Sequence, residues 1–193
     1  VVVRACTATG AHGVGLDALA RQLAANRSAL RPHDRADADL PTWTGRVDGL
    51  EALPWQDLAW DSRATRLAWL GLQGDGFADA VATARARHGA ARIGLVLGTS
   101  ASTIAVSEAA YRRLEADGGF PSNLRHEALH TPHAVTQFVQ QALRLEGPAL
   151  TVSTACSSGA KAFAVAERWL RLGLADAVVA AGVDALGGSL LWG

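Results

Sequence analysis

Two kinds of hydrophobic pattern alternate along this chain. Short, nearly continuous apolar runs with β-branched residues predict buried strands, and they occupy residues 1–6, 91–97, 148–153 and 176–182. Segments with apolar residues at helical spacing predict helices, and they occupy residues 16–25, 61–72, 77–88, 101–115, 135–145 and 163–172. Strands and helices that alternate in this way predict an α/β fold, in which a parallel or mixed sheet is covered by helices on both faces.

The first apolar run is followed by a loop of small residues over positions 9–15. A strand, a glycine loop and a helix are also the outline of a phosphate or dinucleotide site. The loop lacks the G-x-G-x-x-G spacing, however, and the chain has no G-x-x-x-x-G-K-[ST] motif. A tight turn for close packing is therefore the favoured interpretation. A polar surface connection is expected over residues 26–41, followed by a short edge strand over residues 42–47.

Cys156 lies where the predicted strand 148–153 turns into the helix that runs to residue 172. A helix N-terminus offers unpaired N–H groups and a partial positive charge, and both favour a thiolate over a thiol. The same N–H groups can hold the oxyanion that forms when a thioester carbonyl is attacked. A lone cysteine is more often a buried structural residue. The strand–cysteine–helix setting reverses that preference and makes Cys156 a candidate nucleophile.

Metal sites are weakly supported by this sequence. Cys156 has only Cys6 as a cysteine partner, and no C-x-x-C spacing exists. His126, His130 and His133 have spacings of four and three, which could place three imidazoles on one helical face. Pro132 argues against one continuous helix there. Three separate surface or capping histidines are expected instead, and no metal site is predicted.

Composition excludes several classes of protein. The 193 residues carry 18 basic and 18 acidic side chains, so a basic nucleic-acid-binding face is not expected. No apolar stretch reaches the ~18 residues of a membrane span. Two distant cysteines do not make a disulfide framework, which indicates a reducing, cytoplasmic location. The chain has no methionine and stops on an apolar segment, so we expect it to be a piece of a longer protein.

The segment around Cys156 reads Ser-Thr-Ala-Cys-Ser-Ser-Gly at 153–159, with Glu-Gly-Pro at 146–148 before it and a predicted strand at 175–182 after it. Together these residues resemble the active-site region of β-ketoacyl-acyl-carrier-protein synthases. These enzymes are the elongating condensing enzymes of fatty-acid and polyketide synthesis, and they have the thiolase fold. Residues 1–193 are similar to the N-terminal half of such an enzyme, without its C-terminal half. The resemblance implies a thiolase-like mixed sheet and one half of a duplicated fold.

The resemblance also implies a reaction. By this likeness Cys156 takes an acyl group from an acyl carrier protein, without a cofactor. Two histidines, which belong to the half absent from this sequence, promote decarboxylation of a malonyl-carrier thioester, and the carbanion attacks the acyl-enzyme. Ala101 corresponds to a position where a bulkier residue often gates the acyl pocket, so its small size implies a roomy pocket. Family members pair across the strand before the cysteine, so a homodimer or a ketosynthase-like heterodimer using roughly residues 150–154 is implied.

Other functions remain open alternatives. One is a coenzyme-A-using enzyme of the same fold, either a thiolase or an initiating synthase, which the histidines of the missing half would distinguish. Another is a non-catalytic partner like the chain-length factors of polyketide systems, but these typically lack the nucleophile. An α/β-hydrolase is excluded because the sequence contains no G-x-S-x-G elbow.

Overall fold

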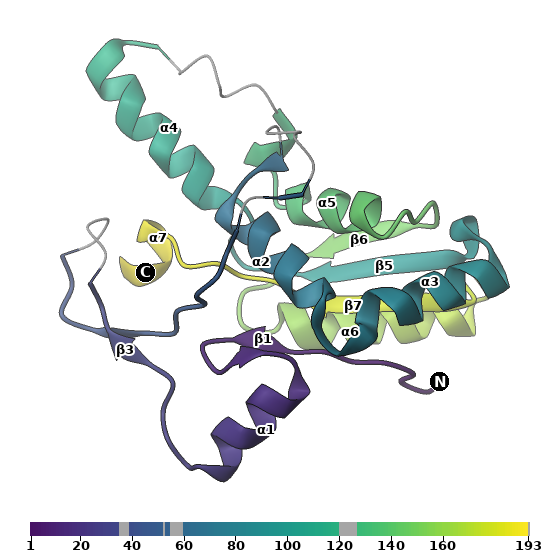
Figure 1. Cartoon of the computed structure of the whole chain (residues 1–193). Helices are drawn as coiled ribbons and strands as arrows, with labels where there is room; N and C mark the ends of the chain where they lie inside the picture. The colour runs from purple at the N-terminus through teal and green to yellow at the C-terminus, as the bar shows by residue number, and fades with distance from the viewer. Residues whose placement is uncertain (35–38, 52, 55–59, 120–126, 193) are drawn as a thin grey trace.

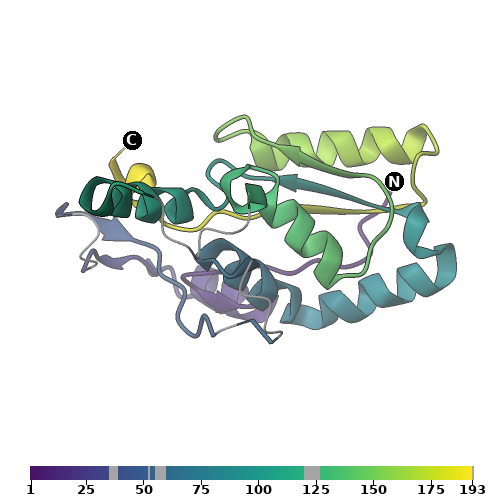
Figure 2. The ribbon, with the colours of Figure 1, turned by 90° about the horizontal axis from the view of Figure 1, so that it is seen from above.

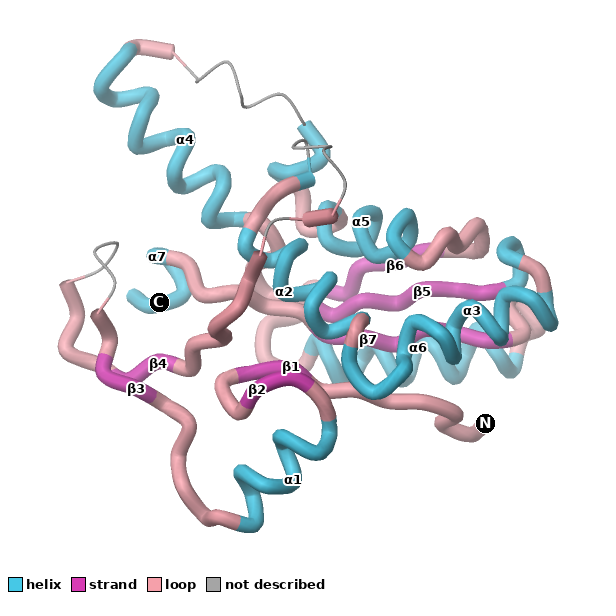
Figure 3. Tube along the Cα trace, viewed as in Figure 1, coloured by secondary structure: helices cyan, strands magenta, loops and turns pink. Residues whose placement is uncertain are grey.

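The computed structural model centres on a three-stranded parallel sheet with strand order β6-β5-β7 (Figures 1 and 3). It describes residues 1–34, 39–51, 53–54, 60–119 and 127–192. The middle strand is β5 (Ile93–Gly98), with β6 (Ala149–Val152) and β7 (Ala177–Gly182) on either side. Three of the predicted strands are thereby confirmed, and the sheet is parallel in both ladders.

Helices cover both faces of this sheet, as the sequence predicts. Figure 2 shows α6 (Ser158–Arg171) on one side, with α3 (Phe77–His88) and α5 (Ala134–Ala142) on the other. Alternate residues of β5 serve the two layers: Ile93, Leu95 and Leu97 join the larger core, and Val96 packs against α6. Every residue of β5 is buried. The strand is continuously apolar because both of its faces are covered.

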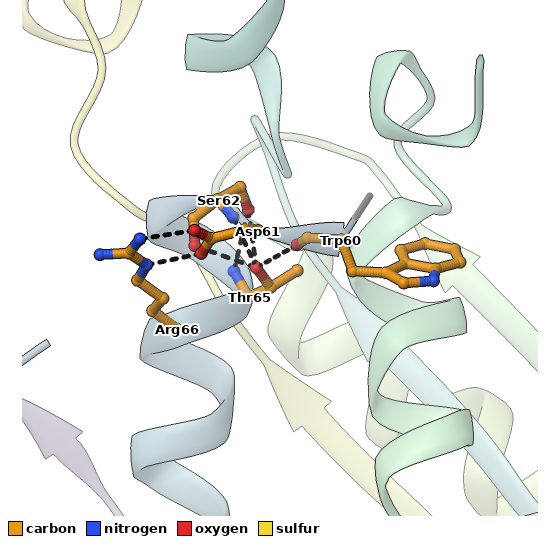
Figure 4. Close-up of polar contacts among 5 residues, drawn as sticks. All are labelled: Trp60, Asp61, Ser62, Thr65 and Arg66. Atoms are coloured by element: carbon orange, nitrogen blue, oxygen red, sulfur yellow. Dashed lines mark hydrogen bonds and ion pairs between the residues drawn. The ribbon is translucent and has the colours of Figure 1, made fainter. Parts of the chain in front are cut away.

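Helix α2 (Arg63–Leu72) packs in the same layer as α5 and begins at the predicted position. Ser62 caps it: the Ser62 hydroxyl accepts from the Thr65 N–H at 3.1 Å, and Thr65 Oγ1 accepts from the Ser62 N–H at 3.0 Å. Asp61 holds Arg66 through two hydrogen bonds, and the Thr65 hydroxyl lies 2.6 Å from the carbonyl of buried Trp60 (Figure 4). This capping box satisfies amides that the first turn leaves unpaired.

Helix α4 (Ile104–Asp117) extends away from the carboxyl edge of the sheet (Figures 1 and 2). It ends at Gly118, which adopts the left-handed conformation that glycine favours at the end of a helix. A short helix, α7 (Gly188–Trp192), lies against α4, and Glu108 accepts hydrogen bonds from its first amides. Short 3-10 turns occupy Gly74–Gly76, Ala90–Arg92 and Glu127–His130.

The N-terminal segment differs from the prediction. Residues 1–8 form no strand; the first strands are β1 (Thr9–Gly10) and β2 (Gly13–Val14), which pair with each other before α1 (Leu16–Ala24). Val1 exposes 80% of its surface, and Cys6 is exposed. The prediction of a buried strand over residues 1–6 is wrong, because no described strand pairs with this run.

A second small ladder joins β3 (Arg31–Pro32) to β4 (Trp43–Thr44). The edge strand expected within residues 42–47 is therefore confirmed, in shorter form. Its partner lies in the segment that was expected to be only a surface connection. Among the helices that the structure describes, none is long and apolar enough to cross a membrane.

Candidate active site

The chain turns sharply between the end of β6 at Val152 and the start of α6 at Ser158. Cys156 lies in this turn, and its side chain is exposed. The preceding residue, Ala155, has a φ of 51°, in the left-handed region that residues with a Cβ rarely adopt. The predicted strand–turn–helix setting of Cys156 is confirmed, whereas its role as a nucleophile stays a prediction.

Hydroxyl groups hold the turn in this conformation. The buried Ser158 hydroxyl accepts a hydrogen bond from the Thr154 N–H at 2.9 Å and donates to the Ala155 carbonyl at 2.7 Å. The Ser157 hydroxyl donates to the Thr154 carbonyl at 2.8 Å. The residues on both sides of Cys156 are thus fixed by local bonds, so the thiol is carried by a pre-organised segment.

Thr99 connects this turn to the middle strand of the sheet. It follows β5 directly, and its N–H donates to the carbonyl of Val152 at the end of β6, at 3.0 Å. Its carbonyl lies 3.5 Å from the Ser158 hydroxyl. The carboxyl ends of β5 and β6 therefore meet beside Cys156, which is the edge where parallel α/β sheets place their sites.

Asp184, two residues beyond β7, reaches across to the loop after β5. Its carboxylate accepts hydrogen bonds from the Thr99 hydroxyl at 2.9 Å, the Ser100 N–H at 2.9 Å and the Ala101 N–H at 3.0 Å. Sequence reasoning gave Asp184 no such role. A partial signal existed, because an acidic residue just past one strand and Gly-Thr-Ser just past another lie at the same edge of a parallel sheet. The strand order, which places β7 beside β5, decides that they meet.

Ala101, the predicted pocket residue, lies in the loop between β5 and α4 and is half-buried. Its amide is one of the groups bound by Asp184. The structure thus brings Ala101 to the same edge of the sheet as the Cys156 turn, through their shared neighbour Thr99. Contact between Ala101 and an acyl chain stays a prediction.

The described histidines make separate contacts. His133 immediately precedes α5, and its Nδ1 lies 2.7 Å from the hydroxyl of Thr151 on β6. That hydroxyl is also 2.6 Å from the hydroxyl of buried Thr136. His130 Nδ1 lies 2.6 Å from the Ser107 hydroxyl on α4. These two histidines contact different hydroxyls, so they are separate, as expected. The side chain of His133 does not cap α5, and its contact with β6 was not foreseen.

His126 lies outside the described residues, as does any contact it makes. Within the parts of the chain that the structure does describe, no group of three histidine, cysteine, aspartate or glutamate side chains could hold a metal ion. The groups that the structure places at the Cys156 turn are a thiol, hydroxyls and backbone amides.

Comparison of the sequence with known protein families identifies the family to which the chain belongs. Residues 62–192, more than half of the chain, match the family described as "Beta-ketoacyl synthase, N-terminal domain". The chain belongs to the beta-ketoacyl synthase family. It is similar to nodulation protein E of Rhizobium sp. (strain N33), with 30% identity over 91% of the chain and 45% of the relative. Nodulation protein E of Rhizobium meliloti (strain 1021) is 35% identical over 53% of the chain and 25% of the relative.

Solved structures of beta-ketoacyl synthases and their relatives share the fold. A ketosynthase in complex with its chain length factor, from Xenorhabdus doucetiae, matches 94% of the chain with a TM-score of 0.77 and 27% identity, over 46% of its own length. A beta-ketoacyl synthase from Burkholderia phymatum STM815 matches 96% of the chain at 21% identity and TM-score 0.71, over 47% of its length. The ishigamide ketosynthase/chain length factor matches 96% at 20% identity and TM-score 0.71, over 53% of its length. The predicted thiolase-type fold is confirmed, and the chain spans about half the length of these relatives.

Proposed function

We propose that this chain carries the acyl-accepting cysteine of an elongating β-ketoacyl-acyl-carrier-protein synthase, with Cys156 as the nucleophile. The observation that supports this most directly is the exposed thiol in a hydrogen-bonded turn at the N-terminus of α6. A thiolate presented in this way can approach a thioester without moving the backbone. A buried structural cysteine would be shielded from solvent, and Cys156 is not.

The first half-reaction is acyl transfer. The Cys156 thiolate attacks the carbonyl carbon of an acyl-carrier thioester and forms a tetrahedral oxyanion. The Cys156 N–H is the group proposed to hold that oxygen, because an amide beside a helix N-terminus is well placed to donate to an oxyanion. The Ser158 N–H, the first amide of α6, already donates to the Ala155 carbonyl at 3.0 Å. When the intermediate collapses, the bond from carbon to the carrier sulfur breaks. The carrier leaves as a thiolate and takes up a proton, and the acyl group stays on Cys156.

The second half-reaction forms the carbon–carbon bond. Malonyl-carrier thioester loses carbon dioxide, and the resulting carbanion attacks the acyl carbonyl on Cys156. The bond to the cysteine sulfur then breaks, which returns the thiolate and leaves a 3-oxoacyl group on the carrier. We assign the enolate-stabilising role to neither His130 nor His133, since each holds a structural hydroxyl. We expect that role to belong to residues outside these 193, so the chain alone should not condense.

A partner subunit is part of this proposal. Strand β6 forms one edge of the described sheet, and its Leu150 exposes 40% of its surface. An edge strand with an exposed apolar side chain suits pairing with a second chain. The partner is a second copy or a ketosynthase-like subunit, docked along roughly residues 150–154. The pairing of the Xenorhabdus ketosynthase with its chain length factor supports the second form. We place the enzyme in the cytoplasm, with acyl carrier protein as its acyl donor.

The Xenorhabdus complex of a ketosynthase with its chain length factor also raises an alternative, in which this chain is the non-catalytic member of such a pair. An exposed cysteine in a held turn favours the catalytic member, because a subunit without chemistry has no need of a presented thiol. A coenzyme-A-using enzyme of the same fold would acylate the same residue from a different donor. Offering both acyl-carrier and acyl-coenzyme-A thioesters to the enzyme distinguishes these two donors.

The test is acylation of the complete protein by an acyl-carrier thioester, followed by intact-mass measurement and peptide mapping. We expect one acyl group on Cys156, and we expect Cys156→Ser to lose most of it, because a hydroxyl without an adjacent base is a poor nucleophile. Cys6→Ser is the matched control and should be acylated as the wild type is. Equal acylation of the Cys156→Ser protein, or acylation mapped to Cys6, would overturn the proposal.

A further inference from the structure

The carboxylate of Asp184 is the common acceptor for the loop that follows β5. The Thr99 hydroxyl, the Ser100 N–H and the Ala101 N–H all donate to its Oδ1 atom, at 2.9, 2.9 and 3.0 Å. The Ser100 N–H also lies 3.1 Å from Oδ2. Hydrogen bonds to an ionised acceptor are stronger than neutral ones. One side chain from the end of β7 therefore fixes successive backbone positions of a loop that belongs to another strand.

The loop held by Asp184 has little freedom of its own. The Thr99 hydroxyl donates to Asp184 and accepts from the Ser102 N–H at 2.8 Å, so it is used twice. Thr99 and Ser102 are 1% and 4% exposed, and Ser102 has a φ of 47°. Non-glycine residues keep such a conformation only where their surroundings impose it. Without the Asp184 carboxylate, the amides of Ser100 and Ala101 lose the acceptor that imposes this arrangement.

The same loop touches the turn that carries Cys156. The Thr99 N–H bonds to Val152 on the strand before the cysteine, and the Thr99 carbonyl approaches the Ser158 hydroxyl on the helix after it. Asp184 thus acts on a loop with one side packed against the Cys156 turn. Within that loop Ser100 is exposed and Ala101 is half-buried, whereas Thr99 and Ser102 are buried.

We propose that Asp184 is a positioning residue that sets acyl-chain-length selectivity by fixing the backbone of residues 99–102 beside the thioester on Cys156. This inference rests on the proposed function, since it assumes that Cys156 is acylated. Asp184 acts through the Ala101 backbone and does not itself touch the acyl chain. If the backbone of residues 99–102 is held in one position, acyl chains that differ by a few methylene groups meet the same fixed surface and are bound with different affinities. A backbone that can move adapts to each chain and discriminates less between them.

The experiment compares Asp184→Ala with Asp184→Asn in the complete protein. Alanine removes every acceptor, whereas the asparagine Oδ1 can still take the three bonds that reach Oδ1 here. The measurement is the efficiency of Cys156 acylation by acyl-carrier thioesters of increasing chain length. We expect the ratio of short-chain to long-chain efficiency to change by about threefold or more in Asp184→Ala and to stay near wild type in Asp184→Asn.

Asp176→Ala is the matched control. Asp176 precedes β7 at the opposite end of that strand, where its carboxylate binds Arg92 at 2.7 and 3.0 Å and does not contact the loop. We expect this variant to keep the wild-type chain-length ratio. Amide hydrogen exchange supplies a second readout: the Ser100 and Ala101 amides should exchange faster in Asp184→Ala than in wild type or in Asp176→Ala.

The outcomes separate this inference from the proposed function. Acylation by the wild type, with an unchanged ratio or a uniform loss at all chain lengths in Asp184→Ala, overturns the positioning role alone. An equal shift in Asp176→Ala overturns it too. Absence of acylation in the wild type overturns both proposals. If Asp184→Ala does not fold, Thr99→Val takes its place, because it removes the hydroxyl shared by Asp184 and Ser102, and the same shift is expected.

Discussion

Gly98 on β5 lies directly against the backbone of Ser158 at the start of α6. A methyl group on Gly98 would come within 2.7 Å of the Ser158 carbonyl carbon and oxygen, and within 2.8 Å of the Gly159 nitrogen. No Cβ tolerates backbone atoms at these distances, so the helix can rest on the sheet here only if residue 98 is glycine. Ser158 also bonds to Thr154 and Ala155 in the turn that carries Cys156, so the close approach of α6 to Gly98 and the held turn share one residue.

We expect Gly98→Ala to destabilise the folded protein by about 1–3 kcal/mol, because α6 must shift away from the strand. Gly182 is the matched control, since it is the register partner of Gly98 on β7. A methyl group there would meet its nearest neighbour, the Gly98 carbonyl oxygen, at 3.8 Å, which is ordinary contact. Urea unfolding measures both variants. Equal stability of Gly98→Ala and Gly182→Ala would contradict the close-approach argument.

Ser158→Ala should lower the free energy of unfolding by ~1–3 kcal/mol. The variant removes the buried hydroxyl that accepts from the Thr154 N–H in a partly buried hydrogen bond. The rate of Cys156 alkylation should change as well, since the turn loses the bonds that hold it. Ser157→Ala also removes a hydroxyl that bonds to the turn, but this hydroxyl is exposed and water can replace it. The smaller loss is expected for Ser157→Ala. A larger loss in that variant would mean that the exposed hydroxyl, not Ser158, holds the turn.

Cys156 should be alkylated faster than Cys6 by limiting iodoacetamide near neutral pH. Both thiols are exposed, so a difference in rate must come from the chemical setting and not from access. Cys156 lies in a hydrogen-bonded turn at the start of α6, whereas Cys6 lies in a segment without regular structure. Peptide mapping gives the two rates, and unfolding in denaturant should make them equal. Faster labelling of Cys6 in the folded protein would remove the support for Cys156 as the nucleophile.

Glu108 should make stability depend on acid pH. Hydrogen bonds from Ser189 and Gly188 hold the pKa of Glu108 below its ordinary value of 4.5, although partial burial opposes this. A carboxylate with a depressed pKa stabilises the folded state above its ordinary pKa, and the effect is lost as the pH falls through the folded value. Wild type should therefore exceed Glu108→Gln in stability near neutral pH, and the difference should shrink in acid.

The measurement is the denaturant midpoint of wild type and Glu108→Gln from about pH 7 to about pH 3. Glu167→Gln is the control, because Glu167 and Arg171 form an exposed ion pair within α6. Exposed ion pairs of this kind contribute little to stability. A difference between wild type and Glu108→Gln that stays constant with pH would show that the carboxylate does not tie α7 to α4.

Much of the fold could be predicted because its signals are local. The apolar runs after residue 90 became β5, β6 and β7, and the helical spacings became α1 to α6, within a few residues of the expected ends. The turn at Cys156 was also predictable, since a strand pattern and a helix pattern meet there with small residues between them. These features depend on neighbours in sequence, and a single sequence records its neighbours directly.

The tertiary structure decided everything that depends on pairing across the chain. Residues 1–6 carry the apolar composition of a strand but form none in the described structure, because composition does not supply a partner. Asp184 meets the loop after β5 from 83 to 85 positions away, and His133 meets Thr151 from a different element. The strand order β6-β5-β7 brings these groups together. The sequence by itself predicted Cys156 as the nucleophile and placed it between a strand and a helix. Only the packing of strands and helices decided which side chains hold that residue and its surroundings in place, because such contacts are fixed by burial and hydrogen bonding between distant segments.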